Sequence, residues 1–312
     1  MTDSLLRRAQ HSLSPLQWRE IDQALAWCDQ DPVANVVIAM HLELARDSGV
    51  MSPSLWAVKR RSRLGLTGLA RELVGVIWNG ANLTALLPDS DGDAEAHNDV
   101  CADVAAAMVA RLTRPAALVG SAAVTLDLWG RVEPWWGPSR EVRSSQLSMA
   151  ISSTPRHMTS DPLGLDLTAV RRATMDDYEL LLLASVHMFI GEVGYDPMRH
   201  GRASYEARLR ALIRAGHAFV QFGLIDGRRQ VVFKADVGAV AGDVAQVQGV
   251  WVHPTLRGRG LAKAGISAVV EATQASIAHT VSLYVNDFNQ PAVASYRAVG
   301  FTEVGRFATV MF

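Results

Sequence analysis

The sequence predicts a mixed α/β protein with two domains, and three observations support this fold class. The chain has 312 residues, about twice the ~150 of a typical domain. Hydrophobic residues make up 49% and charged residues 20%, which is enough apolar material for a buried core and excludes disorder as the main state. Helix-like and strand-like patterns alternate on both sides of a proline-, glycine- and serine-containing segment at 152–164. We therefore expect domains at 1–155 and 163–312.

The composition also narrows the function. The formal net charge is −1, so the chain lacks the basic character of a protein that wraps nucleic acid. Cys28 and Cys101 show no CxxC spacing, which favours a reducing cytoplasm and argues against a thiolate metal site. No apolar stretch reaches the ~18 residues of a membrane span, and the first twenty residues lack the apolar core of a signal peptide.

The first domain is expected to be a smaller α/β unit. Gly80 and Ala81 provide the turn between two of its strands. The expected elements are strands at 73–78, 82–87 and 116–120 and helices at 94–112 and 124–132.

Two features of the first domain have a structural and a functional interpretation. Trp135 and Trp136 form a bulky turn, for which we expect packing in preference to a binding platform. The basic run at 59–63 is expected to be a solvated loop, and contact with a phosphate-bearing acceptor such as tRNA is the alternative.

The second domain has a more definite order of elements. Asp176 and Asp177 are N-cap residues for its first helix, and Asp226-Gly227 is a hairpin signal. The pattern is β-α-α-β-β-β-α-β-α-β. Its strands are expected at 167–172, 218–225, 231–240, 244–252, 281–286 and 304–312, and its helices at 178–190, 204–215, 261–277 and 291–299.

One turn in the second domain points to chemistry. The strand at 244–252 runs through Arg257, Gly258, Arg259 and Gly260 into a helix. A helix start leaves backbone N–H groups unpaired and carries partial positive charge, and glycines let those amides curl around an anion. There is no GK[ST] sequence, and Lys263 stands where the dinucleotide fingerprint needs glycine or alanine. The turn predicts a phosphate site, with an ordinary glycine turn as the alternative.

Two motifs in this domain resemble those of the GCN5-related N-acetyltransferase (GNAT) superfamily. Arg257-x-x-Gly260-x-Ala262, after an apolar strand and a proline, resembles its acetyl-CoA diphosphate motif. The segments 283–292 and 295–301 are similar to its second hallmark. The resemblance covers roughly 163–312 and implies a GNAT fold there. The whole chain is similar to two-domain bacterial proteins in which a domain of unknown function precedes a GNAT domain, and one interpretation of domain one is a degenerate GNAT-like half.

The resemblance also implies roles for individual residues. Backbone groups of the 250–252 segment would pair with the pantetheine arm, and the amides after Arg257 would hold the diphosphate. Asn289 would hydrogen-bond the arm, and Tyr296 would act as general acid. The implied acetyl-CoA site comprises Val250, Trp251, Val252, Arg257, Gly258, Arg259, Gly260, Leu261, Ala262, Lys263, Asn289, Ala292 and Tyr296.

Strand alternation predicts which way the side chains of this strand point. It places Gln246, Gln248, Val250 and Val252 on one face and Trp251 on the other. The side chain of Trp251 is therefore expected in the core.

The residue at the usual position of the general base differs from the family pattern. The glutamate of many GNAT enzymes is replaced by Gln246, which cannot accept a proton at neutral pH. An amine with a pKa of ~10.4 is neutral about once in 10³ at pH 7, a cost of ~4–5 kcal/mol. Glu192, in the segment 191–197 that is expected to be a loop, is the first candidate for the base. The other candidates are Asp196, Asp236 and His187. Asp236 shares a strand face with Lys234, where we expect a salt bridge, and a place in the acceptor cleft is the alternative.

The sequence thus predicts a cytoplasmic, acetyl-CoA-dependent N-acetyltransferase that works by direct attack in a ternary complex. The acceptor would be a primary amine of a small molecule or peptide. Two alternatives are a non-catalytic acyl-CoA-binding sensor and a small-molecule acetyltransferase similar to the mycothiol synthases. Neither a membrane nor nucleic acid is an expected partner. No metal is expected, because no His/Cys/Asp/Glu set in the sequence has metal-ligand spacing. A homodimer is left open.

Overall fold

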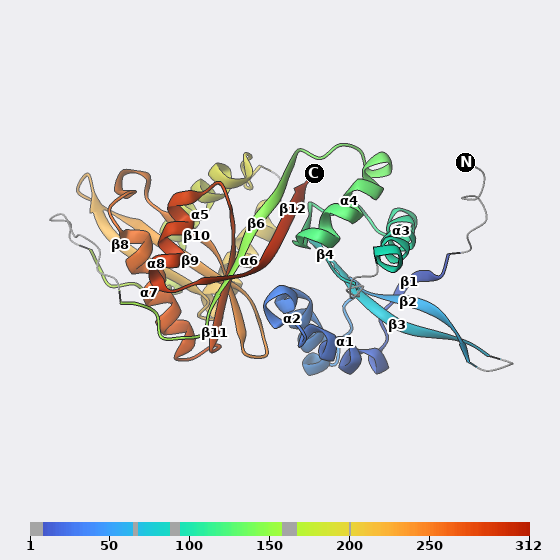
Figure 1. Cartoon of the computed structure of the whole chain (residues 1–312). Helices are drawn as coiled ribbons and strands as arrows, with labels where there is room; N and C mark the ends of the chain where they lie inside the picture. The colour runs from blue at the N-terminus through green and yellow to red at the C-terminus, as the bar shows by residue number, and fades with distance from the viewer. Residues whose placement is uncertain (1–8, 65–67, 88–93, 158–166, 200) are drawn as a thin grey trace. The chain divides into compact units, whose positions relative to one another are not determined.

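The chain folds into two compact units that exchange strand segments. The computed structural model describes residues 9–64, 68–87, 94–157, 167–199 and 201–312 (Figure 1). Unit 1 comprises Met1–Ser148 and Gly305–Phe312, and unit 2 comprises Met149–Val304. Part of the boundary segment expected at 152–164 lies outside the described residues, and the ranges 1–155 and 163–312 stay a prediction.

Unit 1 contains the elements expected after residue 73 and several that were not anticipated before it. Its strand order is β1-β2-β3-β4-β5-β12-β6. The elements are β1 (His11–Pro15), η1 (Trp18–Glu20), α1 (Ile21–Cys28), α2 (Pro32–Ser48), β2 (Leu55–Leu64), β3 (Gly68–Asn79), β4 (Asn82–Leu86), α3 (Ala94–Arg111), β5 (Ala117–Ser121), α4 (Ala122–Trp136) and β6 (Glu141–Ile151).

The basic run at 59–63 is not a solvated loop, so that expectation is wrong. It lies in β2, which pairs antiparallel with β1 and β3. The pleat turns alternate side chains to opposite faces. Lys59 is therefore buried, with its Nζ 2.7 Å from Glu20 Oε1, while Arg60 is exposed and pairs with Glu72. Composition alone does not distinguish a strand with alternating basic residues from a solvated loop.

The two tryptophans at the end of α4 have different environments. Trp136 packs edge-on against Phe312, as expected. Trp135 is 74% exposed, so the expectation of packing is wrong for this residue. Both belong to the last turn of a helix, where neighbouring residues point in directions about 100° apart and only one can face the core.

Unit 2 confirms most of the expected element order. The strand order is β6-β11-β10-β9-β8-β7. Its elements are β7 (Arg171–Arg172), η2 (Met175–Asp177), α5 (Tyr178–Val193), α6 (Arg202–Arg214), β8 (Ala218–Ile225), β9 (Arg228–Ala241), β10 (Val244–Val252), η3 (Pro254–Leu256), α7 (Leu261–Gln274), β11 (Thr280–Asn286), α8 (Gln290–Val299) and β12 (Thr302–Met311). Much of the strand expected at 167–172 is irregular, with a single bridge at Leu167.

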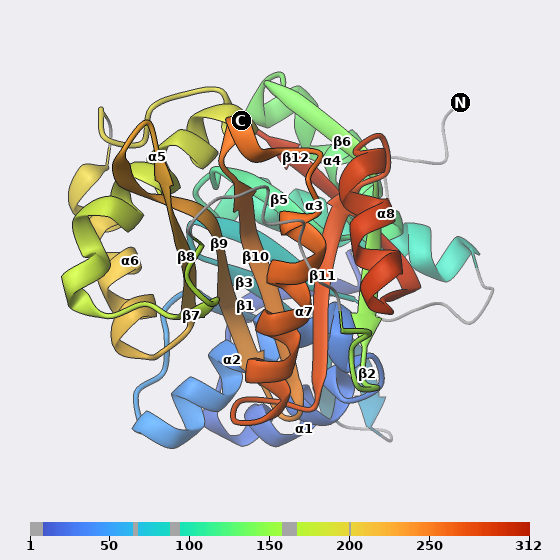
Figure 2. The same ribbon diagram turned by 90° about the vertical axis from the view of Figure 1, so that its left-hand side faces the viewer.

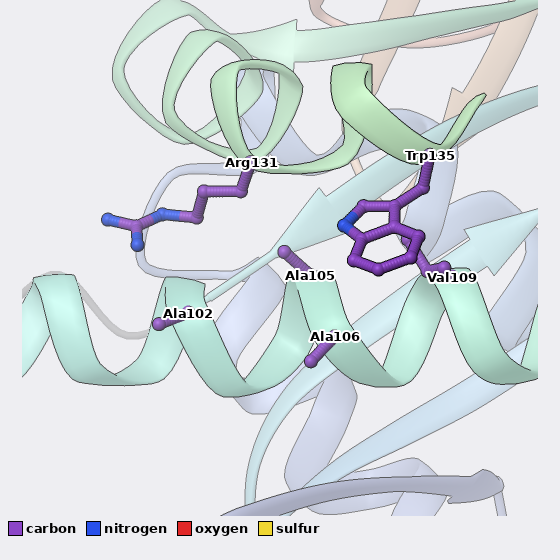
Figure 3. A pocket seen from close by; sticks show the side chains of 6 residues that line it. All are labelled: Ala102, Ala105, Ala106, Val109, Arg131 and Trp135. Atoms are coloured by element: carbon purple, nitrogen blue, oxygen red, sulfur yellow. The ribbon is translucent and has the colours of Figure 1, made fainter. Parts of the chain in front are cut away.

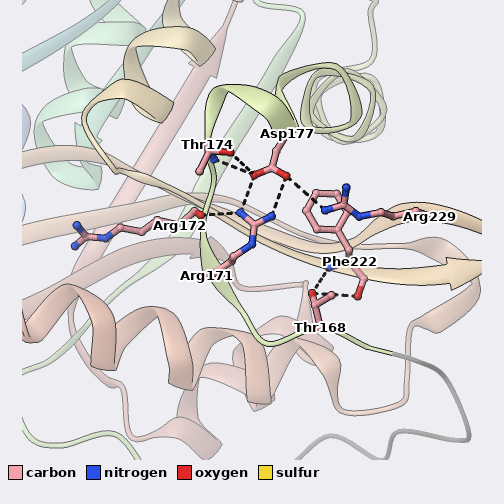
Figure 4. Close-up of polar contacts among 7 residues, drawn as sticks. All are labelled: Thr168, Arg171, Arg172, Thr174, Asp177, Phe222 and Arg229. Atoms are coloured by element: carbon pink, nitrogen blue, oxygen red, sulfur yellow. Dashed lines mark hydrogen bonds and ion pairs between the residues drawn. The ribbon is translucent and has the colours of Figure 1, made fainter.

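The first helix of unit 2 begins at a buried carboxylate (Figure 4). Asp177 Oδ2 accepts hydrogen bonds from the Thr174 N–H at 2.9 Å and from Arg171 Nη1 at 2.7 Å. The hydrogen bond from Arg171 is the largest of several effects that lower the pKa of the Asp177 carboxyl to about 2. Asp177 thus closes a capping box with Thr174, which replaces the simple N-cap expected for this residue.

The sheet of unit 2 carries helices on both faces. Phe233 and Lys234 are adjacent in β9 and so point to opposite faces. A Cβ on Gly265 of α7 would come within 2.5 Å of the Phe233 ring, whereas Lys234 contacts Met188 of α5. Figure 2 shows α7 lying across the strands of this unit. The glycine in α7 allows this helix to approach the strand closely.

Two strands are shared between the units. β12 pairs antiparallel with β5, so the C-terminal segment completes the sheet of unit 1. The end of β6 belongs to unit 2, where β6 is next to β11 in the strand order. Each unit therefore contains part of the last strand of the other half of the chain: Gly305–Phe312 in unit 1 and the end of β6 from Met149 in unit 2. None of the helices in the described ranges has the length and apolar character needed to cross a bilayer.

Candidate active site

The turn between β10 and α7 has the geometry of an anion site. Gly258 and Gly260 adopt positive φ angles of 76° and 81°, which glycine reaches without strain. Within the described ranges, the six successive N–H groups from Gly258 to Lys263 have no hydrogen-bond acceptor, and the first backbone bond of the helix is Ala264 N–H to Gly260 O. These donors, together with the positive end of the α7 dipole, can bind a phosphate group.

The two arginines of the turn are exposed but differ in their contacts. Arg257 Nε donates to the Val252 carbonyl at 3.3 Å, so its guanidinium lies back along the strand. Arg259 has no ion-pair partner in the described part of the chain. Both guanidinium groups are available to add charge-assisted bonds to an anion.

An opening between two parallel strands leads away from this turn. β10 and β11 pair only where Val244–Gln246 face Thr280–Ser282. Beyond Gln246 the rest of β10 has no partner in β11. The strands therefore separate toward the end that carries the turn, and backbone groups of β10 are left free to pair with an extended ligand.

A β-bulge changes the side-chain pattern of β10. Gln248 is opposite Asp236 and Trp251 is opposite Lys234, so two residues of β10 face one of β9. Gln248 and Trp251 consequently share one face, and the predicted separation of these two side chains is wrong. A bulge inserts one residue and reverses the alternation after it. The expected core position of Trp251 is confirmed, since it is 7% exposed and packs in an apolar cluster with α5.

The residues expected to act beyond β11 lie at the start and middle of α8. Asn289 caps the helix, and its Oδ1 accepts from the Ala292 N–H at 3.3 Å. Tyr296 is 8% exposed and its ring lies edge-on to Phe301. Burial, and secondly the charge of Glu192, raise the pKa of the Tyr296 phenol above its ordinary value. The phenol therefore keeps its proton at neutral pH, as a general acid must.

Glu192 does not lie in a loop, which corrects the sequence-based expectation. It is an exposed residue in the last turn of α5. Its charge contributes to the raised pKa of Tyr296 and also to that of Tyr205 on α6. Glu192 is thus electrostatically coupled to both phenols.

The other candidate bases have structural partners or lie elsewhere. Asp196 Oδ1 accepts from the Met198 N–H at 2.9 Å, and Arg199 lies near its other oxygen. Asp236 is buried and paired with Lys234 at 2.6 Å. His187 is exposed on α5, and its charge contributes, after burial, to the lowered pKa of His253.

Sequence reasoning missed three features of this region. Lys234 was interpreted as one member of a strand-face ion pair, but not as a fully buried one that also donates to Gly249 O at 3.2 Å. Gly249 has φ +59°, the bulge that carries it was not expected, and Tyr205 was not considered. The Gln-Gly sequence within an otherwise apolar strand was a signal that could have indicated the bulge.

Unit 1 contains two further features, neither of which lies at the predicted site. A shallow pocket between α3 and α4 is lined by alanines, Arg131 and Trp135 (Figure 3). The ligand atoms of His97, Cys101 and Asp127 lie within 4.8 Å of one another. Arg131 donates to both Asp127 oxygens at 3.0 Å, so its guanidinium group pairs with the carboxylate in place of a metal ion. The expectation of no metal stays a prediction.

Two family models match the chain. The model of the Acetyltransferase (GNAT) family matches residues 199–301, which include β10, the turn and α8. A model described as a domain of unknown function, DUF4081, matches residues 64–181. No curated protein matches the sequence.

Solved structures with a similar fold cover almost the entire chain. A Drosophila protein is 12% identical and has a TM-score of 0.61, with 96% of this chain and 98% of that chain covered. A GCN5-related N-acetyltransferase from Sphaerobacter thermophilus is 14% identical, with a TM-score of 0.56 and 97% and 95% coverage. A tandem GNAT protein from the clavulanic acid biosynthesis pathway is 17% identical, with a TM-score of 0.51 and 96% and 98% coverage. At these identities the likeness shows a GNAT fold.

Proposed function

We propose, on the premise that residues 199–301 are a domain of the GNAT acetyltransferase family, that this protein transfers an acetyl group from acetyl-CoA to a primary amine. The observation that carries the proposal is the run of six unpaired N–H groups from Gly258 to Lys263 at the start of α7. These groups would bind the diphosphate of the coenzyme. The separated ends of β10 and β11 would then receive its pantetheine arm.

In this proposal the acetyl group moves directly between donor and acceptor. The amine nitrogen attacks the thioester carbonyl, the carbonyl oxygen takes up negative charge, and the C–S bond then breaks to release the thiolate of CoA. Tyr296 gives its phenolic proton to that thiolate. An N–H group of β10 near the bulge stabilises the oxyanion, a role that Val250 fits because it has no register partner on β9.

Glu192 is the proposed base for the amine. Its side chain is exposed in the last turn of α5, where an amine arriving from solvent can reach it. Its carboxylate also shares an electrostatic environment with Tyr296. A negative charge at this position would both attract an ammonium group and accept its proton, directly or through water.

The runner-up function is binding of acyl-CoA without catalysis. The observation in its favour is Gln246, which is 6% exposed, lies beside Ser282 in the paired part of β10 and β11, and offers no proton acceptor. A small-molecule acetyltransferase similar to the mycothiol synthases is a narrower version of the main proposal.

The experiment that separates these functions combines binding with turnover. Thermal unfolding is measured with and without acetyl-CoA, and free thiol release is then followed with a panel of primary amines. Stabilisation together with thiol release and an acetylated product supports the proposal. Stabilisation with no product across the panel favours the sensor, and no stabilisation contradicts both functions.

A further inference from the structure

A charged pair is buried beside the bulge of β10. Lys234 is fully buried, and its Nζ lies 2.6 Å from Asp236 Oδ2. The same Nζ donates to the carbonyl oxygen of Gly249 at 3.2 Å, and its remaining neighbour is Met188 Sδ at 3.9 Å. A buried ammonium group is costly unless it is paired and hydrogen-bonded, and apolar residues of similar volume often serve stability equally well. Stability alone therefore does not explain why Lys234 and Asp236 are buried here.

Gly249 is fitted to this charged pair. A Cβ at this position would come within 2.9 Å of Asp236 Oδ2 and 3.2 Å of Lys234 Nζ. Its φ of +59° is also unfavourable for other residues. The bulge and the ion pair therefore depend on each other. Gly249 lets the backbone of β10 approach the ion pair, and the ammonium group of Lys234 fixes the Gly249 carbonyl.

The orientation of one peptide group follows from this contact. In a trans peptide the C=O and N–H bonds point in opposite directions. Because the Gly249 carbonyl points to Lys234, the N–H of Val250 points away from it. Neither Gly249 nor Val250 has a register partner on β9, so this orientation depends on the hydrogen bond from Lys234.

We propose that Lys234 and Asp236 form a positioning pair that holds the peptide between Gly249 and Val250, so that the Val250 N–H meets the carbonyl oxygen of the bound thioester. The inference rests on the proposed function. Asp236 fixes the ammonium group, and the ammonium group fixes the Gly249 carbonyl. Without the pair the peptide is free to rotate, and the donor that stabilises the oxyanion is lost while the diphosphate site stays intact.

The test uses acetyl-CoA labelled with ¹³C at the thioester carbonyl. A hydrogen bond to that oxygen polarises the carbonyl and moves its ¹³C resonance downfield of the value for free acetyl-CoA. The charge-neutral double variant Lys234→Met/Asp236→Asn removes the donor to Gly249. We expect the resonance of the bound label to return toward the free value, with the CoA dissociation constant changed less than about threefold. With an acceptor amine, kcat should fall roughly 10²–10³-fold and KM should stay unchanged.

The control variant removes a buried pair of the same kind in unit 1. Lys59 and Glu20 lie 2.7 Å apart with exposed side-chain fractions of 7% and 10%. Lys59→Met/Glu20→Gln should keep the wild-type carbonyl resonance and kcat. Restoring the donor with Lys234→Arg, with Asp236 retained, should recover part of the downfield shift.

Separate outcomes distinguish this inference from the function on which it depends. A wild-type resonance in the double variant overturns the positioning role alone. Wild-type protein that binds no acetyl-CoA overturns the proposed function together with this inference. If the double variant does not fold, Gly249→Ala tests the same peptide: a displaced resonance supports the role, and an unchanged one overturns it.

Discussion

The two halves of the chain, from β1 to β6 and from β7 to β12, repeat one order of elements. Each contains a strand, two helices, three strands, a helix, a strand, a helix and a strand in chain order, apart from the short 3₁₀ turns. In each, a buried acidic residue closes a 3₁₀ turn and a capping box before the first helix: Glu20 with Gln17, and Asp177 with Thr174. The parallel strands β4 and β5 pair only at their first residues, as β10 and β11 do. This shared order supports the interpretation of the first half as a degenerate GNAT-like unit.

The two halves differ in the sequence that follows their fourth strand. After β10 this sequence contains Arg257, Gly258, Arg259 and Gly260, whereas after β4 it contains Asp89, Asp91, Asp93 and Glu95. Residues 88–93 lie outside the described part of the chain. Acidic side chains at a helix start stabilise its dipole and repel an anionic ligand. We therefore expect the order of elements to be common to both halves and coenzyme binding to be confined to unit 2.

The largest expected effect concerns the phenol that only unit 2 places after its fifth strand. Tyr296→Phe should lower kcat roughly 10²–10⁴-fold, because the thiolate then leaves without a proton donor. Acetyl-CoA binding should be unchanged, since the hydroxyl acts on the leaving group. Steady-state kinetics on an accepted amine measure this effect, and an unchanged kcat would remove Tyr296 from the mechanism.

The raised pKa of Tyr296 determines how kcat should depend on pH. Because the folded protein holds the phenol protonated above its ordinary value, kcat should show no loss from its ionisation between pH 7 and about 10. A descending limb near pH 8 that is absent from Tyr296→Phe would contradict this assignment.

The next effect tests the diphosphate site itself. Gly260 and Gly201 both cap helices with left-handed backbones, at φ +81° and +93°. Alanine should strain each by about 1–2 kcal/mol, but only Gly260→Ala should displace amides that bind the ligand. At a concentration of 100 times the wild-type Kd, acetyl-CoA should stabilise wild-type protein by about 2.7 kcal/mol, and a tenfold weaker Kd reduces this to about 1.4 kcal/mol.

Gly201→Ala is the matched control for this experiment. It should lower the unfolding free energy of the free protein to a similar extent and keep the full stabilisation by acetyl-CoA. Equal loss of ligand stabilisation in both variants would show that backbone strain alone explains the effect.

A smaller effect concerns the capping carboxylates that both units share. The pKa of Asp177 is about 2 in the folded protein, below its ordinary 3.8. A lowered folded pKa contributes stability above the unfolded value, and this is lost as pH falls from about 4 to 2. The contribution at neutral pH is about 2 kcal/mol. Arg171→Met should therefore lower stability at pH 7 and leave a smaller difference from wild type near pH 2.

Chemical unfolding at pH 7 and pH 2 measures this effect. Arg202→Met removes an exposed guanidinium group from Glu206, which keeps its ion pair with Arg210, and should change stability by less than about 0.5 kcal/mol. A loss for Arg171→Met that is the same at both pH values would contradict the electrostatic explanation.

The smallest expected effect is in unit 1. Trp135 is exposed at a shallow pocket of unit 1. Trp135→Ala should leave the stabilisation by acetyl-CoA unchanged within about 0.5 kcal/mol. A lost stabilisation would show that unit 1 takes part in coenzyme binding and would break the proposed division between the units.

The parts of the fold that sequence predicts well are those fixed by local chemistry. The Asp226-Gly227 turn is confirmed because both residues adopt positive φ, at 51° and 73°, which few other pairs tolerate. The helix that starts at Leu261 is confirmed for a similar reason, since Gly260 allows the sharp entry of the chain.

The parts that sequence does not predict depend on distant partners. Lys59 becomes a buried strand residue only because Glu20 reaches it. The bulge at Gly249 depends on Lys234 and Asp236 in the neighbouring strand, so period-2 reasoning on β10 alone assigns Gln248 to the wrong face. The exchange of β6 and β12 between units depends on sheet pairing over long sequence separations, which no local pattern records.

Titration calorimetry of CoA, compared with pantetheine, which lacks the diphosphate, tests the central claim most directly. The account predicts one CoA molecule per chain and pantetheine affinity lower by at least about 100-fold, because the N–H groups from Gly258 to Lys263 would have no anion to bind. Two CoA molecules per chain, or equal affinity for CoA and pantetheine, would contradict it.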